Sequence, residues 1–165
     1  MLGFQTVTDL IAGADVLRRR RYGRIEVADG AFRCVRLRPY PSLVSKPRIW
    51  LLGRFQHRFI PGDRCWLYYN QPLWHSNYLA LSYVVASRDS TLASVDRALE
   101  VLDEIARLKK SDAILADVSN RRFSDRILAR RGWEPHCPAL LHRHFIKRFY
   151  GQYPPRPRWI ERLDS

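Results

Sequence analysis

The stretch between residues 78 and 150 constrains the fold more than any other part of this chain, because strand and helix signals alternate along it. A continuous apolar run at Tyr78–Ala86 is typical of a strand covered on both faces. An apolar stripe at helical spacing follows, then a second apolar run at Ala113–Val118, a second helical segment and a last alternating run at His142–Tyr150. This order predicts a β-α-β-α-β unit within a single α/β domain that has a mixed sheet and helices on both faces.

Two helices are expected inside this unit. Either Ser90 or Ser94 can act as the N-cap of the first, since a hydroxyl there accepts a hydrogen bond from the backbone. The second helix is expected to end at Gly132, which can adopt a left-handed C-cap without a steric penalty. The core-facing stripe of the first helix consists of Val95, Ala98, Leu99, Leu102, Ile105 and Ala106.

The N-terminal half is less specific. Apolar residues at helical spacing predict a first helix that ends in the arginine run Arg18–Arg21, where positive charge suits the negative end of the helix dipole. Asp29 and Gly30 separate two alternating runs, which predicts a β-hairpin. The aromatic, β-prone segment Arg64–Tyr69 predicts a further strand.

The domain is expected to comprise residues 1–150, and residues 151–165 to form a Pro-rich, peripheral extended tail or a segment that docks on a partner's aromatic groove. No apolar run reaches the length of about 20 residues that a bilayer requires, so no membrane partner is expected. The chain has three widely spaced cysteines and no CxxC motif. This pattern favours reduced thiols in a cytoplasmic protein over a disulfide framework or a zinc site.

The chain is strongly basic, with 29 Lys and Arg against 16 Asp and Glu and a net charge of +13. Such a field favours anionic partners, nucleic acid among them. Most of the charges are scattered, however, and solvated faces would explain them equally well. The segment Phe145–Tyr150 mixes aromatic and basic side chains, as stacked bases would require, but an ordinary two-faced strand has the same pattern.

In the order of its elements and motifs, the segment from 78 to 150 resembles the C-terminal half of the GNAT superfamily of acetyl-CoA-dependent N-acetyltransferases. That family has an (Arg/Gln)-x-x-Gly-x-(Gly/Ala) loop after its central strand. Arg88 and Ala93 match the two ends of this motif, whereas Thr91 stands where the family has its first glycine. Asn120 matches an asparagine that ends the next strand. Gly132-Trp133 matches a Gly-aromatic pair, with one extra residue before it.

The resemblance implies acetyl-CoA or another acyl-CoA as cofactor and an amine, on a small molecule or a protein, as acceptor. Backbone N–H groups at the N-terminus of the helix would hold the pyrophosphate. A capped strand-to-helix turn without any ligand would account for the same residues. The positions implied in cofactor binding are Val84, Val85, Arg88, Ser90, Thr91, Ala93 and Asn120.

Catalysis is marked less clearly. Leu128 stands where the family often has a tyrosine general acid, and it can donate no proton, so an inactive relative is an alternative. The candidates for acid–base chemistry are Tyr83, His75 and Asp117. Each candidate also has a structural explanation. Tyr83, in an apolar strand, is typical of a core residue, and His75, in a loop, is typical of a surface residue. Asp117, in a strand, would be explained by a hydrogen bond to a neighbouring loop.

His136, His142 and His144 lack a ligand spacing with carboxylates or thiols, so no metal is expected. Two hypotheses remain. The first is a divergent acyl-CoA-dependent N-acyltransferase of unknown amine substrate, or its inactive relative. The second is a basic nucleic-acid- or ribosome-binding protein without catalytic activity.

Overall fold

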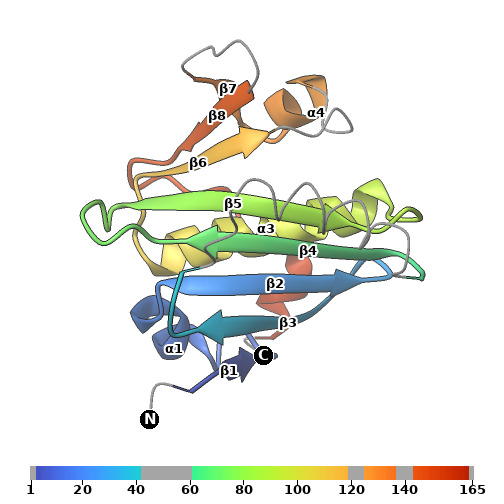
Figure 1. The fold of residues 1–165 in the computed structure, drawn as a ribbon, viewed down its shortest axis with the longest axis horizontal. Coiled ribbons are helices and arrows are strands. Elements are labelled where there is room, and N and C mark those ends of the chain that lie inside the picture. Colours follow the sequence, from blue (N-terminus) through green and yellow to red (C-terminus); the bar gives the residue numbers. More distant parts are fainter. Residues whose placement is uncertain (1–2, 42–60, 119–124, 137–142, 164–165) are drawn as a thin grey trace.

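The computed structural model describes residues 3–41, 61–118, 125–136 and 143–163, and it confirms an α/β domain built on a mixed sheet (Figure 1). The sheet has eight strands in the order β1-β3-β2-β4-β5-β6-β8-β7. The strands are β1 (Gln5–Val7), β2 (Tyr22–Ala28), β3 (Ala31–Arg38), β4 (Arg64–Asn70), β5 (Tyr78–Ala86), β6 (Ala113–Val118), β7 (Glu134–Pro135) and β8 (Arg143–Arg148). The described helices are α1 (Ala14–Arg19), α3 (Leu92–Leu108), α4 (Asp125–Arg130) and α5 (Arg158–Glu161).

Neighbouring strands are antiparallel with one exception, the parallel pair β5 and β6 that α3 connects. The predicted hairpin joins β2 to β3. Asp29 and Gly30 both have positive φ angles, 54° and 69°, which a two-residue hairpin turn of this kind requires. The strand next to β4 is β2 rather than β3, so β2 lies between β3 and β4 in the sheet.

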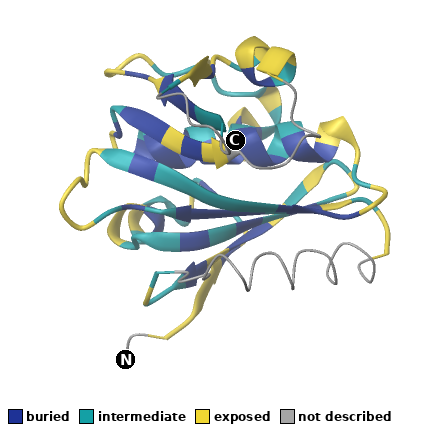
Figure 2. Cartoon of the chain, turned by 45° about the horizontal axis from the view of Figure 1, so that its top comes forward, coloured by how far each residue is buried: buried dark blue, intermediate teal, exposed yellow. Residues whose placement is uncertain are grey.

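Helix α3 packs on one face of β2, β3 and β4, and α1 packs beside it (Figure 1). All six residues of the predicted apolar stripe are buried there, and the dark core in Figure 2 lies between this helix and the sheet. The N-cap is neither Ser90 nor Ser94 but Thr91, whose Oγ1 accepts a hydrogen bond from the Ser94 N–H at 3.3 Å. Ser94 is instead fully buried, and its hydroxyl accepts from the Gly30 N–H of the hairpin turn at 2.9 Å.

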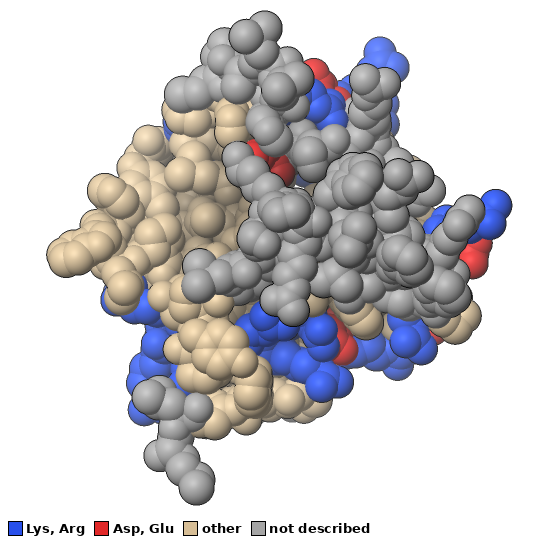
Figure 3. Space-filling view, in the orientation of Figure 1, with Lys and Arg blue, Asp and Glu red and all other residues tan. Residues whose placement is uncertain are grey.

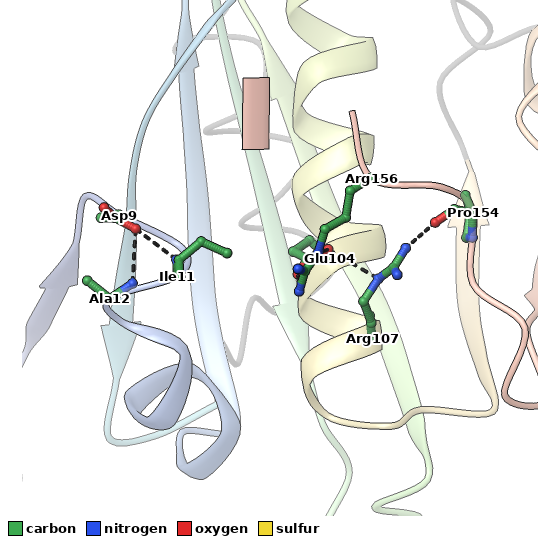
Figure 4. A network of polar contacts seen from close by, with 7 residues as sticks. All are labelled: Asp9, Ile11, Ala12, Glu104, Arg107, Pro154 and Arg156. Carbon is green, nitrogen blue, oxygen red and sulfur yellow. Dashed lines mark hydrogen bonds and ion pairs between the residues drawn. The ribbon is translucent and has the colours of Figure 1, made fainter. Parts of the chain in front are cut away.

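The first helix is shorter than its apolar spacing suggests. A turn closed by Asp9 precedes it, since the Asp9 carboxylate accepts from the N–H groups of Ile11 and Ala12 (Figure 4). Leu10 in that turn and Leu17 in α1 are both fully buried. The core therefore extends over the turn and the helix together.

After α4, Gly132 has a φ of 80° and serves as the predicted left-handed C-cap. The N–H of Trp133 donates to the carbonyl of Leu128 at 3.1 Å, and both side chains are buried. Leu128 is thus a core residue.

The Pro-rich segment packs on α3 instead of lying at the periphery. Ile160 of α5 is fully buried. Arg156 reaches the Glu104 carboxylate with bonds of 2.8 and 3.0 Å, and Arg107 donates to the carbonyl of Pro154 (Figure 4). The Glu104 side chain is only 2% exposed, so these arginines neutralise a buried charge.

Cys34 and Cys65 are buried free thiols, whereas Cys137 lies outside the described residues. Burial raises the pKa of Cys65 to about 12, which keeps this thiol protonated and unreactive at neutral pH. None of the described helices is both long and apolar enough to cross a bilayer.

Candidate functional site

The central strand β5 contains a bulge. Tyr68 of β4 is paired with Tyr83 and the next β4 residue, Tyr69, is paired with Leu81, which leaves Ser82 as an extra residue without a partner on β4. A bulge bends its strand and increases the local twist. The direction of β5 therefore changes at Ser82.

The ladder between β5 and β6 ends at the same point. Only Tyr78–Leu81 pairs with Ala113–Ala116. Beyond it, Tyr83–Ala86 keeps β4 as its partner within the described part of the chain, and Asp117 and Val118 keep β8. We call the opening between these two segments the fork, and Figure 1 shows β5 and β6 diverging there. Within the described residues, no strand pairs with Tyr83–Val85 on the side toward β6, so this stretch resembles a sheet edge.

Tyr83 and Asp117 stand on the two arms of the fork, on the face of the sheet away from α3. In β6 the core residues Ile114 and Ala116 face α3, so the alternating position Asp117 points to the other face, where it is exposed. Tyr83 lies beside Tyr68 on that face, with ring centroids 5.8 Å apart. Burial raises the pKa of the Tyr83 hydroxyl and the neighbouring Tyr68 adds to the shift, so this group stays protonated near neutrality.

His144, on the neighbouring strand β8, lies beside Asp117. It is the register partner of Asp117 on β8, and directly opposite residues of an antiparallel pair have Cβ atoms about 5 Å apart on the same face. Sequence reasoning considered His144 only as a metal ligand. Its pairing with Asp117 depends on strand register across a 27-residue interval that no local pattern specifies.

The loop that follows β5 is held rigidly at its base. The Ser87 hydroxyl is buried, accepts from the Arg64 N–H at 3.0 Å and donates to the Gly62 carbonyl at 2.6 Å. The next two residues, Arg88 and Asp89, are exposed. A fixed base therefore presents the Arg88 side chain to solvent at the far end of the fork.

An anion already sits at the N-terminus of α3. The carboxylate of Asp63 accepts from the Thr91 N–H at 2.9 Å and from the Thr91 hydroxyl at 2.7 Å. Burial alone would raise the pKa of Asp63, but hydrogen bonds from Thr91 and Ser94 bring it below its ordinary value. The N–H groups of Leu92 and Ala93 make no hydrogen bond to another described residue.

The remaining predicted positions fall in different places. Val84 packs against the core and Val85 is buried, so only their backbone can face a ligand. Asn120 lies outside the described residues. His75 is exposed in the loop before β5, and the nine residues of that strand, at roughly 3.4 Å each, separate it from the loop at Arg88. The structure therefore brings Tyr83 and Asp117 to the fork but not His75.

Burial and spacing also bear on the hypotheses of nucleic-acid binding and of metal binding. Phe145, Lys147 and Phe149 are each less than 8% exposed, so the rings of Phe145 and Phe149 cannot stack on bases, whereas Tyr150 is exposed. Two of the three rings that suggested a nucleic-acid-binding strand are therefore core residues. Among the described residues, no cluster of three or more His, Cys, Asp or Glu side chains could hold a metal ion.

No family model matches the sequence, and no curated protein is similar to it. Among solved structures, the crystal structure of nourseothricin acetyltransferase is similar, with a TM-score of 0.39 and 14% identity. The likeness covers 88% of this chain and 98% of the acetyltransferase.

Proposed function

We propose that this chain is an acyl-CoA-dependent N-acyltransferase whose acyl donor lies in the fork between β5 and β6. The observation that carries the proposal is the bulge at Ser82, which coincides with the end of the β5–β6 ladder. It leaves one strand edge of the central sheet open toward the loop at Arg88. The order of motifs from Tyr78 to Trp133 supports the same class.

The residues of the fork offer groups of the kind that CoA would need. The amide-containing arm of CoA can pair with backbone groups of Val84 and Val85 as an added strand would. Its phosphates would meet the N–H groups of Leu92 and Ala93 and the Arg88 side chain. Asp63 occupies the N–H of Thr91, so its charge weakens phosphate binding without filling the other donors.

Acyl-CoA supplies a thioester whose carbonyl carbon an amine attacks, so that a C–N bond forms and the C–S bond breaks. His144 is placed to take the proton that the amine loses, and Asp117 beside it stabilises the resulting imidazolium. Tyr83, on the opposite arm, is placed to give a proton to the departing thiolate. The amine would enter from the sheet face away from α3, where all three groups lie.

Calorimetry and thermal unfolding with acetyl-CoA, CoA, pantetheine and ADP test this proposal. Because a ligand that binds the folded state raises Tm by mass action, acetyl-CoA and CoA should both raise it. Pantetheine and ADP should compete with CoA for the arm and phosphate regions respectively. Absence of any shift at millimolar acetyl-CoA would contradict the proposal.

If CoA binds, acyl transfer is measured as thiol release from acetyl-CoA with a panel of primary amines and amine-bearing peptides. Release that depends on the amine would support an active enzyme. Tight CoA binding without release by any member of the panel would favour the inactive relative.

A further inference from the structure

The end of the sheet away from the fork displays an apolar tip. Leu73 and Trp74, in the loop between β4 and β5, are 64% and 92% exposed. Two hydrogen bonds of the buried Gln71 fix this loop. Its backbone N–H donates to the Arg21 carbonyl at 2.8 Å, and its side-chain amide donates to the Ser76 carbonyl at 2.5 Å. Two apolar side chains are thus presented to solvent from a fixed base.

Basic residues at the C-terminal ends of α1 and α3 contact the same loop. Arg21 donates to the Pro72 carbonyl at 3.2 Å. Lys109 donates to Gln71 Oε1 at 3.1 Å and to the carbonyls of Arg18 and Arg20 at 3.1 and 2.6 Å. Burial lowers the pKa of Lys109 to about 8, and the charge of Arg21 adds to the shift.

Further cations are exposed around this base, and few acids oppose them. Arg18, Arg19 and Lys110 are exposed. The nearby carboxylates are Asp15, which pairs with Arg18 at 2.7 Å, and Asp112, which accepts from Asn77 at 2.9 Å. Figure 3 shows an uncharged projection at the left edge of the molecule beside a strip of Lys and Arg.

The other exposed aromatic side chains gather at the same end. Phe4 and Tyr40 are 68% and 55% exposed and lie edge to face at 6.0 Å, and Tyr150 is 64% exposed. Strand register places them there, since Tyr22 is paired with both Arg38 and Asn70, and the Tyr150 N–H donates to the Asp112 carbonyl. Of the eight large apolar side chains that are exposed in the described residues, five lie at this end.

We propose that this end, with Leu73 and Trp74 at its tip and the arginines of α1 beside it, docks on the surface of an anionic lipid bilayer. Trp and Tyr favour the headgroup level, Leu favours the acyl boundary, and Lys and Arg are drawn to anionic lipid. A convex loop tip that includes a leucine suits insertion between headgroups better than a nucleic-acid strand, which needs a groove or a stacking platform. The proposal departs from the sequence-based expectation of no membrane partner, and it is independent of the acyltransferase proposal.

Vesicle co-sedimentation of the full chain tests this inference, with vesicles of phosphatidylcholine alone and of an equal mixture of phosphatidylcholine and phosphatidylserine. We expect binding to the anionic vesicles only, weakened by salt. The double variant Leu73→Ser/Trp74→Ser should bind at least about tenfold more weakly. Arg18→Gln/Arg19→Gln should lose about fivefold for each arginine removed. Circular dichroism checks that both variants are folded.

Matched controls are available elsewhere on the molecule. Leu163→Ser removes an exposed apolar residue, and Arg33→Gln/Arg64→Gln removes two exposed charges from the opposite end of the sheet. Both should bind like the wild type. A blue shift of tryptophan fluorescence on anionic vesicles should occur in the wild type and disappear in Trp74→Ser.

Three outcomes would overturn the inference: no binding to anionic vesicles, equal loss in the control variants, or binding of a labelled single-stranded oligonucleotide in preference to vesicles. The last result would identify the surface as a nucleic-acid site instead.

Discussion

The two ends of β5 differ in how they are held, and the difference separates two kinds of surface. At Ala80 and Leu81 the strand has partners on both sides, and the loop before β5 presents apolar and basic groups on a fixed base. At Tyr83–Ala86 it has one partner among the described strands, and Tyr83 and Asp117 stand on the two arms of the opening. One extra residue marks the boundary. In the two proposals made above, this bulge separates a membrane-docking end of β5 from a catalytic end.

The largest expected effect comes from His144 at the fork. Replacing His144 with Gln removes the proposed base and should lower kcat for acyl transfer about a hundredfold, with little change in CoA affinity. Steady-state kinetics with thiol detection measure it. His75→Gln makes the same substitution at the other end of β5 and should have normal kinetics; equal losses in the two variants would erase the functional contrast between the ends.

The next largest effect is a loss of stability that should leave binding at both ends of β5 unchanged. Arg156→Ala leaves the buried Glu104 carboxylate with Arg107 as its remaining partner, so the free energy of unfolding should fall by about 2 kcal/mol. Urea unfolding measures the change, with the exposed Arg158→Ala as control. Vesicle binding and CoA binding by the folded protein should be unchanged, and a selective loss of either would show that the tail serves one end in particular.

Deletion of Ser82 addresses the boundary itself. Without Ser82, residues Leu79 to Ala86 alternate regularly between the core and the opposite face, and β5 can stay straight against β6. The variant should fold and keep its vesicle binding, but bind CoA roughly tenfold more weakly because hydrogen bonds to the β5 edge are lost. Ser82→Ala retains the bulge and should bind CoA normally. Unchanged CoA affinity in the deletion variant would refute a role for the bulge.

The smallest effect concerns the anion at the N-terminus of α3. Asp63→Asn should lower the free energy of unfolding by about 1 kcal/mol because the attraction between the Asp63 charge and the helix dipole is lost, while CoA affinity rises severalfold because a negative charge is removed. Since hydrogen bonds hold the pKa of Asp63 below its ordinary value, its stabilising effect is full near neutral pH and is lost as the pH falls through that lowered pKa. The stability gap between the two proteins should therefore close in acid.

Asp89→Asn separates the two contributions of Asp63. It removes one negative charge from the loop between β5 and α3, which Asp63 contacts through Thr91, without removing the bonds between Asp63 and Thr91. It should raise CoA affinity without loss of stability. A fall in CoA affinity in both variants would place the phosphates away from this loop.

Local patterns predicted the elements well and the fork poorly. The stripe of α3, the Asp29-Gly30 turn and the Gly132 cap each depend on residues close in sequence, and periodicity or a required φ specifies them. Ser82 reads as one more residue of an apolar strand, so a bulge there has no local signal. It becomes visible only through the register with β4.

Long-range contacts explain the other differences. Asp63 caps a helix 28 residues further along the chain, and its contact with Thr91 displaces Ser90 and Ser94 from the role that composition gave them. Proline content suggested a peripheral tail, yet Ile160 is a fully buried member of the core. The capping of α3 and the burial of Ile160 both depend on tertiary contacts, and local sequence patterns do not specify these.

The packing of residues 151–163 also bears on how the chain folds during synthesis. Trp159 lies against Phe32 of the first hairpin, with ring centroids 5.8 Å apart, and Arg97 of α3 stacks on the same indole at 4.5 Å. Contacts so distant in sequence form slowly, since the intervening chain must be closed first. During synthesis the first hairpin and α3 are made before Trp159 and Ile160, so the apolar surface that these two residues cover stays open until they follow.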